Sequence, residues 1–395
     1  SALFNPSNIV DSKYKADVTI FSASGTGQND LYGVNFANIL DGGYNLDTEP
    51  TKNFISNNRG NFNFDILGPS VMFNIDPVHS VAIFTRVRSV TNLTDINGQL
   101  IDEVNKDVDF SESFMIAGGN PNGVTNSWAE IGASYATVLL DRDDHFLKGG
   151  ITLKYLMAGV NGYINGNDLS VVFNKNEANP QLSEYYSTGT MKTAASYDYE
   201  NGDDPKFDMS SGGVGLDLGF TYEYRTNCHT CVGNRYKFKA AASITDIGKL
   251  NYNNIIENTY NVNGRVTQDD IENAEDIFEF FDTNYTKTSS RKGVKANLPT
   301  ALHTNFDWNI DNKFYLNLSG DFNLVDAKKI NSTVIANSVT FTPRYETRQF
   351  SFYVPLTYLQ YSGTQIGAGF RAGPLFIGSG TLFTNLFSNT SKGCN

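Results

Sequence analysis

Apolar and polar residues alternate strictly between Gly213 and Arg225. The apolar set is Val214, Leu216, Leu218, Phe220, Tyr222 and Tyr224. A period of two over this length indicates an extended strand with one apolar and one polar face. The polar face carries carboxylates, a guanidinium and glycines, which suit a wet lumen better than a protein core. The alternation is therefore typical of a transmembrane barrel strand, with lipid on one side and water on the other.

Similar segments recur along the chain and are joined in pairs by short turns. These turns are Asp76–His79, Asp141–His145, Asp311–Asn312, Glu346–Arg348 and Ser362–Gly363. The connections between the pairs are much longer and cover Gly25–Phe62, Thr91–Ser127, Val160–Gly212 and Asp246–Pro299. Bacterial outer-membrane barrels show this asymmetry, with turns in the periplasm and loops outside the cell. A soluble sandwich or propeller is the weaker alternative, because such folds rarely place nearly all long loops at one end.

The pattern predicts an all-β fold: a transmembrane antiparallel up-and-down β-barrel of about 14 strands, located in the bacterial outer membrane. We expect a single domain over residues 1–395, with short periplasmic turns and long extracellular loops that carry one or two short helices. Residues 246–298 are the largest expected loop with a helix. The chain contains no run of 18 apolar residues, so no spanning helix is expected. A mean hydropathy of −0.33 agrees with strands that are half polar.

Two loop segments have a helical pattern. Thr267 can cap a helix with Asp270 three residues later, and apolar residues at Ile271, Ile277 and Phe281 then share one face. A rim helix packed on its own barrel is the favoured interpretation, and a docking surface for a partner is the alternative. Residues 94–105 show a weaker pattern of the same kind.

The apolar face fixes the register of each strand, so the residues that point into the lumen can be read from the sequence. The inward charged set is Arg86, Arg88, Glu130, Lys148, Lys154, Asp217, Glu223, Arg225, Lys237, Lys239, Asp307, Asp321, Arg344 and Arg371. An open ion pore tends to show one dominant sign at its constriction, and a tunnel for apolar ligands needs an apolar lining. The mixture of signs instead predicts ion pairs that fill a narrow lumen, and a barrel that conducts poorly.

Charge and composition limit the classes of partner that this chain is expected to bind. The formal net charge is −12 and the isoelectric point is near 4.8, so a nucleic-acid partner is not expected. The first residues, Ser1–Val10, lack the basic and apolar regions of an export signal. The expected partners are outer-membrane lipid and other outer-membrane proteins or lipoproteins.

Catalytic and metal-binding signals are weak. The four histidines form no recognisable catalytic arrangement with serine and aspartate, so we expect no enzyme activity and no cofactor. Cys228 and Cys231 lie in one turn, with His229 between them. One such pair without a second is weak evidence for zinc, and a disulfide between Cys228 and Cys231 is the favoured interpretation in an oxidising periplasm.

Several phrases of the sequence carry a family resemblance. They are Asn5–Asn8, Gly68–Ser70, His145–Leu156, Gly215–Arg225, Ile244–Gly248 and Arg371–Gly378. Together they resemble a family of outer-membrane β-barrel proteins from Bacteroidota, over nearly the whole chain. The Asn-Pro start is similar, more distantly, to the plug-forming N-terminus of FadL-type and PorV-type barrels. The resemblance implies an N-terminal plug segment at residues 1–15 and carries no site residues. Barrels of this kind commonly end on a closing strand, whereas Thr390–Asn395 reads as a loop.

Two functions follow from these features. The first is a non-enzymatic interaction or structural subunit of a larger outer-membrane assembly for protein export, insertion or nutrient uptake, supported by the charged lumen and the acidic loops. The alternative is a FadL-like transport channel for small or hydrophobic molecules, supported by the N-terminal resemblance. A lateral gap or an apolar tunnel would favour transport, and a blocked lumen with an external apolar patch would favour the assembly role.

Overall fold

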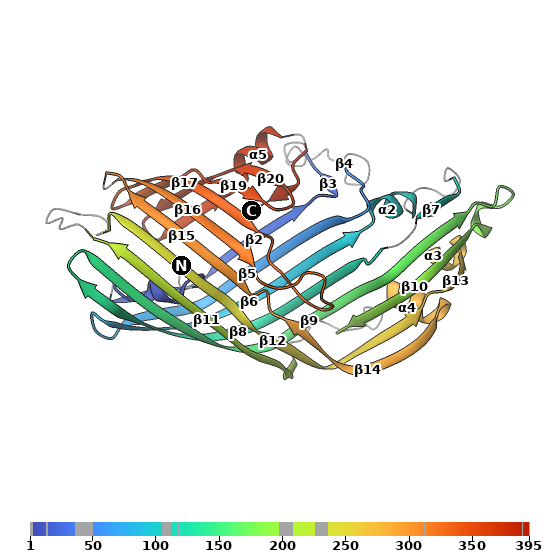
Figure 1. Ribbon diagram of the computed structural model, residues 1–395, viewed down its shortest axis with the longest axis horizontal. Coiled ribbons are helices and arrows are strands. Elements are labelled where there is room, and N and C mark those ends of the chain that lie inside the picture. The colour runs from blue at the N-terminus through green and yellow to red at the C-terminus, as the bar shows by residue number, and fades with distance from the viewer. Residues whose placement is uncertain are drawn as a thin grey trace.

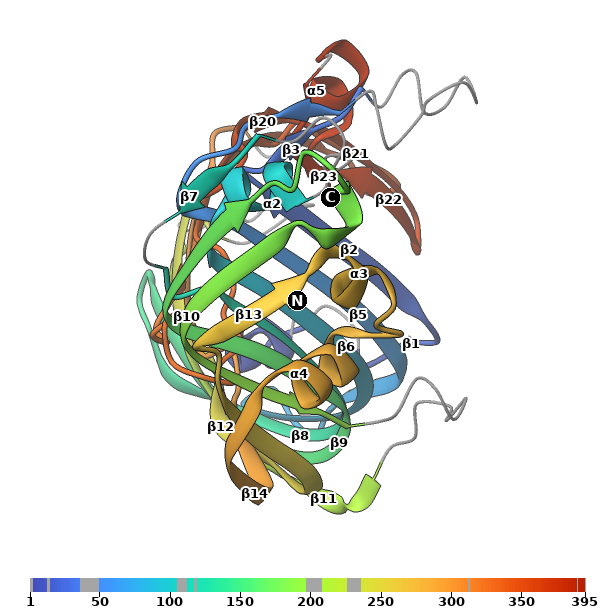
Figure 2. The same ribbon diagram turned by 90° about the vertical axis from the view of Figure 1, so that its right-hand side faces the viewer.

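The fold is a large antiparallel sheet that curls into a barrel (Figures 1 and 2). In the computed structural model, the described residues are 3–12, 15–35, 50–104, 112–116, 119–196, 208–225, 236–311, 313–388 and 390–394. They form one 21-stranded sheet and a separate two-stranded sheet of β3 (Tyr32–Gly33) and β4 (Thr51–Lys52).

Long strands build most of the wall. They are β5 (Asn58–Asn74), β6 (His79–Ile96), β8 (Asn122–Arg142), β9 (His145–Asn174), β11 (Asp208–Tyr224), β12 (Phe238–Asn261), β15 (Ala301–Asn309), β16 (Phe314–Asn323) and β17 (Ser338–Glu346). Short strands complete it. They are β1 (Ala16–Thr19), β2 (Ser22–Asn29), β18 (Phe350–Tyr353), β19 (Leu356–Leu359), β20 (Gly363–Ile366), β21 (Ala368–Ala372), β22 (Leu375–Ser379) and β23 (Gly393–Cys394).

The ladders define the order of strands around the wall. It is β23, β1/β2, β5, β6, β8, β9, β11, β12, β15, β16, β17, β18/β19, β20/β21 and β22, which makes fourteen positions among the described residues. All of these pairs are antiparallel, so the expected up-and-down topology is confirmed. In the described part of the chain, β22 pairs only with β21 and β1 pairs only with β5, which leaves the wall incompletely paired at this seam.

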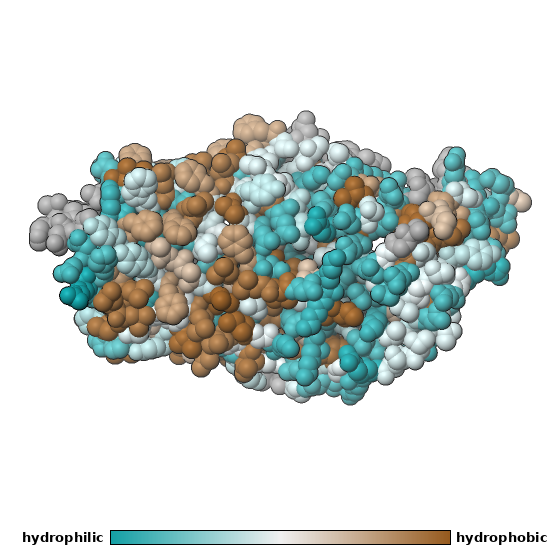
Figure 3. All heavy atoms as spheres, in the orientation of Figure 1, coloured by the Kyte–Doolittle hydropathy of each residue, from teal (hydrophilic) through white to brown (hydrophobic). Residues whose placement is uncertain are grey.

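The two ends of the barrel differ. Short connections join the strands at one end, which we call the turn end, and the remaining elements gather at the other, the crown end (Figure 1). The strands of the turn half carry exposed apolar side chains, including Ile83, Leu153, Phe220 and Trp308. On the face seen in Figure 3, hydrophobic residues gather on the turn half, and the crown half is mostly hydrophilic. Such an apolar band is what a barrel presents to lipid. No described helix is long and apolar enough to span a membrane.

The crown contains more β-structure than the sequence predicts. Its elements are β7 (Phe114–Ile116), β10 (Glu184–Ala195), β13 (Gly264–Thr267), β14 (Thr286–Asn297), α2 (Gly98–Val104), α3 (Gln268–Glu272), α4 (Ile277–Asn284) and the 3₁₀ turn η2 (Pro180–Leu182). The prediction of a loop over 246–298 is wrong, because β12 continues to Asn261 and β14 pairs with it. Strands above the membrane need no apolar outer face, so their alternation is weak.

The helices of the crown pack on the barrel's own strands. Thr267 and Asp270 form the predicted capping box, and these hydrogen bonds from Thr267 lower the pKa of the Asp270 carboxyl. The single helix implied by the pattern is wrong: α3 ends at Glu272, and Asp276 starts α4 with its own cap. Phe281 is buried against β10 and β12, which supports the rim-helix interpretation.

Candidate functional site

A first group of charges fills the centre of the lumen, and Asp246 is its hub. The Asp246 carboxylate accepts from Arg88 Nη1 at 2.6 Å and from Lys154 Nζ at 2.7 Å. Lys154 also reaches Asp217 at 2.8 Å, and Arg86 bonds Asp65 and reaches Glu130 at 3.3 Å. These side chains come from β5, β6, β8, β9, β11 and β12, which the ladders hold in fixed register. Here three cations face four carboxylates, and we call this set the central network.

A second group lies nearer the turn end. Lys148 pairs with Glu223 at 3.3 Å, and Arg225 pairs with Glu223 at 2.6 Å and also bonds Asp11. Arg344 donates to Asp307 at 3.0 Å and lies 3.2 Å from Glu346. Arg371 is at the edge of this group, 3.9 Å from Glu346.

The structure brings together twelve of the fourteen predicted charged residues through ion pairs, with Asp321 paired to His303 at 2.6 Å rather than to a lysine or arginine. Lys237 is wrongly predicted: it is exposed at the turn end, where its ammonium donates to Ile310 O, because β12 begins only at Phe238. Lys239 lies in the lumen without an ion pair to any described residue. The predicted Cys228–Cys231 disulfide falls outside the described residues.

The N-terminal segment, residues 3–12, lies inside the lumen at the turn end, with η1 (Pro6–Ile9) against β8, β9 and β11 (Figure 2). Asn5 donates to Phe220 O at 3.1 Å, and Ser7 Oγ lies 2.7 Å from Thr221 Oγ1. A Cβ at Gly150 would lie 2.5 Å from the backbone nitrogen of Ser7, so glycine is required for the segment to approach the wall. The wall is thus shaped to receive this segment.

A second segment enters the lumen from the crown end. Residues 330–336, which we call the inner loop, connect β16 to β17 and are anchored on the opposite wall. Asn161 Nδ2 donates to Asn331 Oδ1 at 2.7 Å, and Asn92 exchanges two hydrogen bonds with the backbone of Val334. Asn331 and Val334 are each only 2% exposed. Below the inner loop, Trp128, Leu156, Leu250 and Leu298 form a packed apolar cluster inside the barrel.

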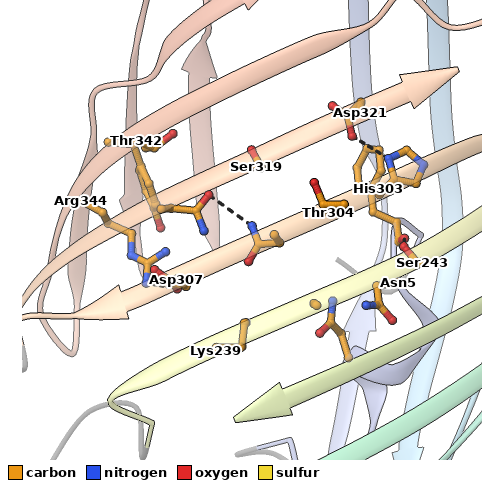
Figure 4. Close-up of a pocket in the computed structure, with 16 residues that line it drawn as sticks. Asn5, Lys239, Ser243, His303, Thr304, Asp307, Ser319, Asp321, Thr342 and Arg344 are labelled. Atoms are coloured by element: carbon orange, nitrogen blue, oxygen red, sulfur yellow. Dashed lines mark hydrogen bonds and ion pairs between the residues drawn. The ribbon is translucent and has the colours of Figure 1, made fainter. Parts of the chain in front are cut away.

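Among the described residues, two pockets in the lumen border β15, β16 and β17. The lower pocket, of about 450 Å³, is lined by Lys239, Asn305, Asp307, Asn317 and Arg344, among others (Figure 4). The upper pocket, of about 410 Å³, extends from the central network to residues 24–28 on β2. Phe4, His303 and Asp321 line both pockets.

One aromatic pair, Phe4 and His303, lies where the two pockets adjoin. The Phe4 ring meets the His303 ring edge to face, with centroids 5.3 Å apart, and Ser243 holds Phe4 by bonding its carbonyl oxygen. Figure 4 shows His303 bonded to Asp321 at the end of the pocket opposite Arg344. A molecule that passes between the pockets must displace Phe4 or move around it.

Sequence reasoning missed several members of the site. Asp246 was assigned to a loop, although it directly follows the alternating stretch of β12 and could have been found by extending the strand. Asp65 lies on β5 opposite Arg88 in register, so a cross-strand pairing argument could have identified it. The inner loop carries no periodic signal that would reveal it. Among the described residues, no group of three or more potential ligands is arranged to hold a metal ion.

The likeness to solved structures is distant. A search of solved structures found the "TodX monoaromatic hydrocarbon channel deltaS2 mutant", with a TM-score of 0.47 and 9% identity over 96% of this chain and 87% of that one. It also found the open form of the ferric-catecholate import receptor Fiu from E. coli K12, with a TM-score of 0.32, 10% identity and 91% and 52% coverage. The ferric yersiniabactin uptake receptor FyuA from Yersinia pestis matches with a TM-score of 0.20, 8% identity and 89% and 53% coverage. This chain thus spans about half the length of the two receptors.

Sequence comparison gives one family. Residues 6–380 match a family model whose description is "Family of unknown function (DUF5723)". A search of the curated proteins found no match.

Proposed function

We propose that this chain, which belongs to the family of unknown function DUF5723, is an outer-membrane barrel that transports small molecules and is closed along its axis at rest. The apolar band around the turn half and the polar crown support a location in the outer membrane. The resemblance of the sequence to barrels from Bacteroidota supports the same location. On this proposal, the short turns lie in the periplasm and the crown lies outside the cell.

The observation that carries the proposal is the pair of neighbouring pockets inside a barrel whose axis is otherwise filled. A barrel interior that serves stability alone is filled by side chains, as it is around the central network and the apolar cluster. The lumen beside β15, β16 and β17 instead keeps two spaces with mixed polar and apolar linings, and Phe4 and His303 line both of them. Pockets on both sides of a narrow contact form a discontinuous route that a movement of the N-terminal segment would connect.

Conductance in planar bilayers tests this proposal. The wild-type protein should conduct poorly, because the N-terminal segment and the inner loop close the axis. Removal of residues 1–12 should produce stable conductance steps, and a synthetic peptide of residues 1–12 added to the turn-end side should suppress them. Large steps in the wild type would contradict the proposal, and so would a silent deletion variant that still migrates as a folded barrel.

A point substitution gives a sharper version of the same test. Gly150→Ala keeps the chain length but should displace the N-terminal segment, since the added Cβ would meet the backbone of Pro6 and Ser7. Gly162→Ala on the same strand is the matched control, because its nearest neighbour would be Ala194 O at 3.8 Å. We expect conductance from the first variant and none from the second.

The assembly role remains the second candidate function, favoured by an external apolar patch on the edge strand β22. On β22, Leu375, Phe376 and Ile377 are 66%, 61% and 69% exposed, and the strand has no second neighbour among the described residues. An apolar edge strand is a ready site for pairing with another protein. A photo-crosslinking residue at Ile377 should then capture an outer-membrane protein or lipoprotein in cells. Crosslinks to lipid alone would speak against this role.

A further inference from the structure

Lys239 is a lumen cation without a counter-ion. It stands directly opposite Asp307 in the β12–β15 ladder, yet no described carboxylate oxygen lies within 4.0 Å of its ammonium. Its ammonium nitrogen makes a cation–π contact with the Tyr236 ring, whose centroid is 5.4 Å away. The other seven predicted lysines and arginines inside the lumen all have an ion pair.

The neighbouring carboxylates are already occupied. Asp307 accepts from Tyr236 Oη at 2.6 Å and from Arg344 at 3.0 Å. Glu223 is held between Lys148 and Arg225. An ammonium that is withdrawn from bulk water without a paired carboxylate is unfavourable. A negative charge brought in from outside the chain would therefore be stabilised at this position.

The rest of the lower pocket offers hydrogen bonds beside apolar contacts from Phe4, Ala241 and Tyr353. Amide and hydroxyl groups line it, namely Asn5, Asn8, Asn305, Asn317, Ser319 and Thr342. The Oδ1 atom of Asp307 is buried and has no hydrogen-bond partner among the described residues, so the charge of this carboxylate is balanced on one oxygen only. The volume of the lower pocket, about 450 Å³, lies within the range of roughly 300–1,000 Å³ that ligand pockets occupy.

We propose that the lower pocket binds a small hydroxylated carboxylate, such as a sugar acid. Lys239 Nζ pairs with the carboxylate of the ligand, and the amide and hydroxyl side chains of the lining bond its hydroxyl groups. Figure 4 shows Lys239 on β12, Asp307 on β15 and Arg344 on β17 around this space. This inference rests on the proposed transport function, because it names the class of molecule that would be transported along the same route.

Calorimetric titration of the intact protein in detergent tests the site, with D-glucuronate and D-glucose as probes. These probes have similar size and hydroxyl groups but differ in charge. Glucuronate should bind at least about tenfold more tightly than glucose, because the charge-assisted hydrogen bond is absent with glucose. Lys239→Gln should abolish this preference, and Lys239→Arg should retain it.

Lys237→Gln is the matched control, because Lys237 lies two residues away and is exposed outside the pocket. It should leave glucuronate affinity unchanged. Equal binding of the two sugars, no binding of either, or full glucuronate affinity in a folded Lys239→Gln variant would overturn the inference. Binding is measured with the N-terminal segment in place and conductance with it removed, so the site and the transport proposal can fail separately.

Discussion

Two halves of the barrel wall are built differently. The paired half, β5 to β12, consists of strands of 17 to 30 residues whose inner faces meet in the central network and the apolar cluster. The pocket half, β15 to β22, has strands of 10 residues or fewer, several of only four or five, and it borders both pockets and the seam.

This contrast separates two tasks within one wall. Long ladders hold buried charges at fixed positions, so each ion can be matched by a partner and the interior can be filled. Short strands with interruptions leave fewer ladder bonds and fewer inward side chains, and spaces remain. We infer that the paired half stabilises the barrel and holds the N-terminal segment, whereas the pocket half carries the route that this segment closes.

The largest expected effect is a loss of unfolding free energy, and it is tested by replacing one carboxylate in each half. Asp246→Asn leaves Arg88 and Lys154 without their shared partner, and breaking a buried pair in this way costs about 3–5 kcal/mol, less where lumen water reaches it. Asp321→Asn should cost at most about 1 kcal/mol, because that side chain is 41% exposed. Urea unfolding in lipid vesicles measures the stability of both variants. Similar losses of unfolding free energy in the two variants would contradict the proposed difference between the halves.

A smaller loss of unfolding free energy is expected when the anchor of the inner loop is removed. Asn331→Ala removes the bonds with Asn126 and Asn161 and leaves buried amides unpaired, which costs about 1–3 kcal/mol. Asn331 has a φ of 52°, so Asn331→Gly separates the lost hydrogen bonds from backbone strain. Hydrogen exchange should accelerate in residues 330–336 in both variants. If only the alanine variant is affected, strain rather than anchoring is the cause.

The smallest effect is expected in the crown, outside both halves. Thr267→Ala removes the cap of α3, at a cost of about 1 kcal/mol confined to that helix. The pKa of Asp270 is lowered in the folded state, so its contribution is complete above the carboxyl's ordinary pKa and is lost as the pH falls through the folded-state value. Hydrogen exchange of residues 268–272 should therefore accelerate under acid in the wild type and change less in Asp270→Asn.

The sequence predicted the paired half well because lipid and lumen impose a strict period of two on its strands. Arg86, Lys154 and Asp217 could be placed inside from that period alone. Asp246 was missed because a β-bulge with a φ of 59° at this residue interrupts the period of β12. Lys237 was misplaced because the period says nothing about where a strand starts.

The pocket half was less predictable. Its pockets depend on the inner loop and the N-terminal segment, which reach distant strands through asparagine and backbone contacts such as Asn92 with Val334 and Asn5 with Phe220. No local pattern encodes contacts between residues more than two hundred positions apart. The same reason hides the isolation of Lys239, since only the folded structure shows that Asp307 and Glu223 are already taken.

The central claim is that the route follows the pocket half, and thiol modification tests it most directly. In a variant without residues 1–12 and with Cys228, Cys231 and Cys394 replaced by serine, one cysteine is introduced at Thr340, beside the upper pocket, or at Val124, in the apolar cluster of the paired half. An anionic methanethiosulfonate reagent should lower the single-channel conductance of Thr340→Cys and leave that of Val124→Cys unchanged. Equal block of both variants, or block of Val124→Cys alone, would contradict the account.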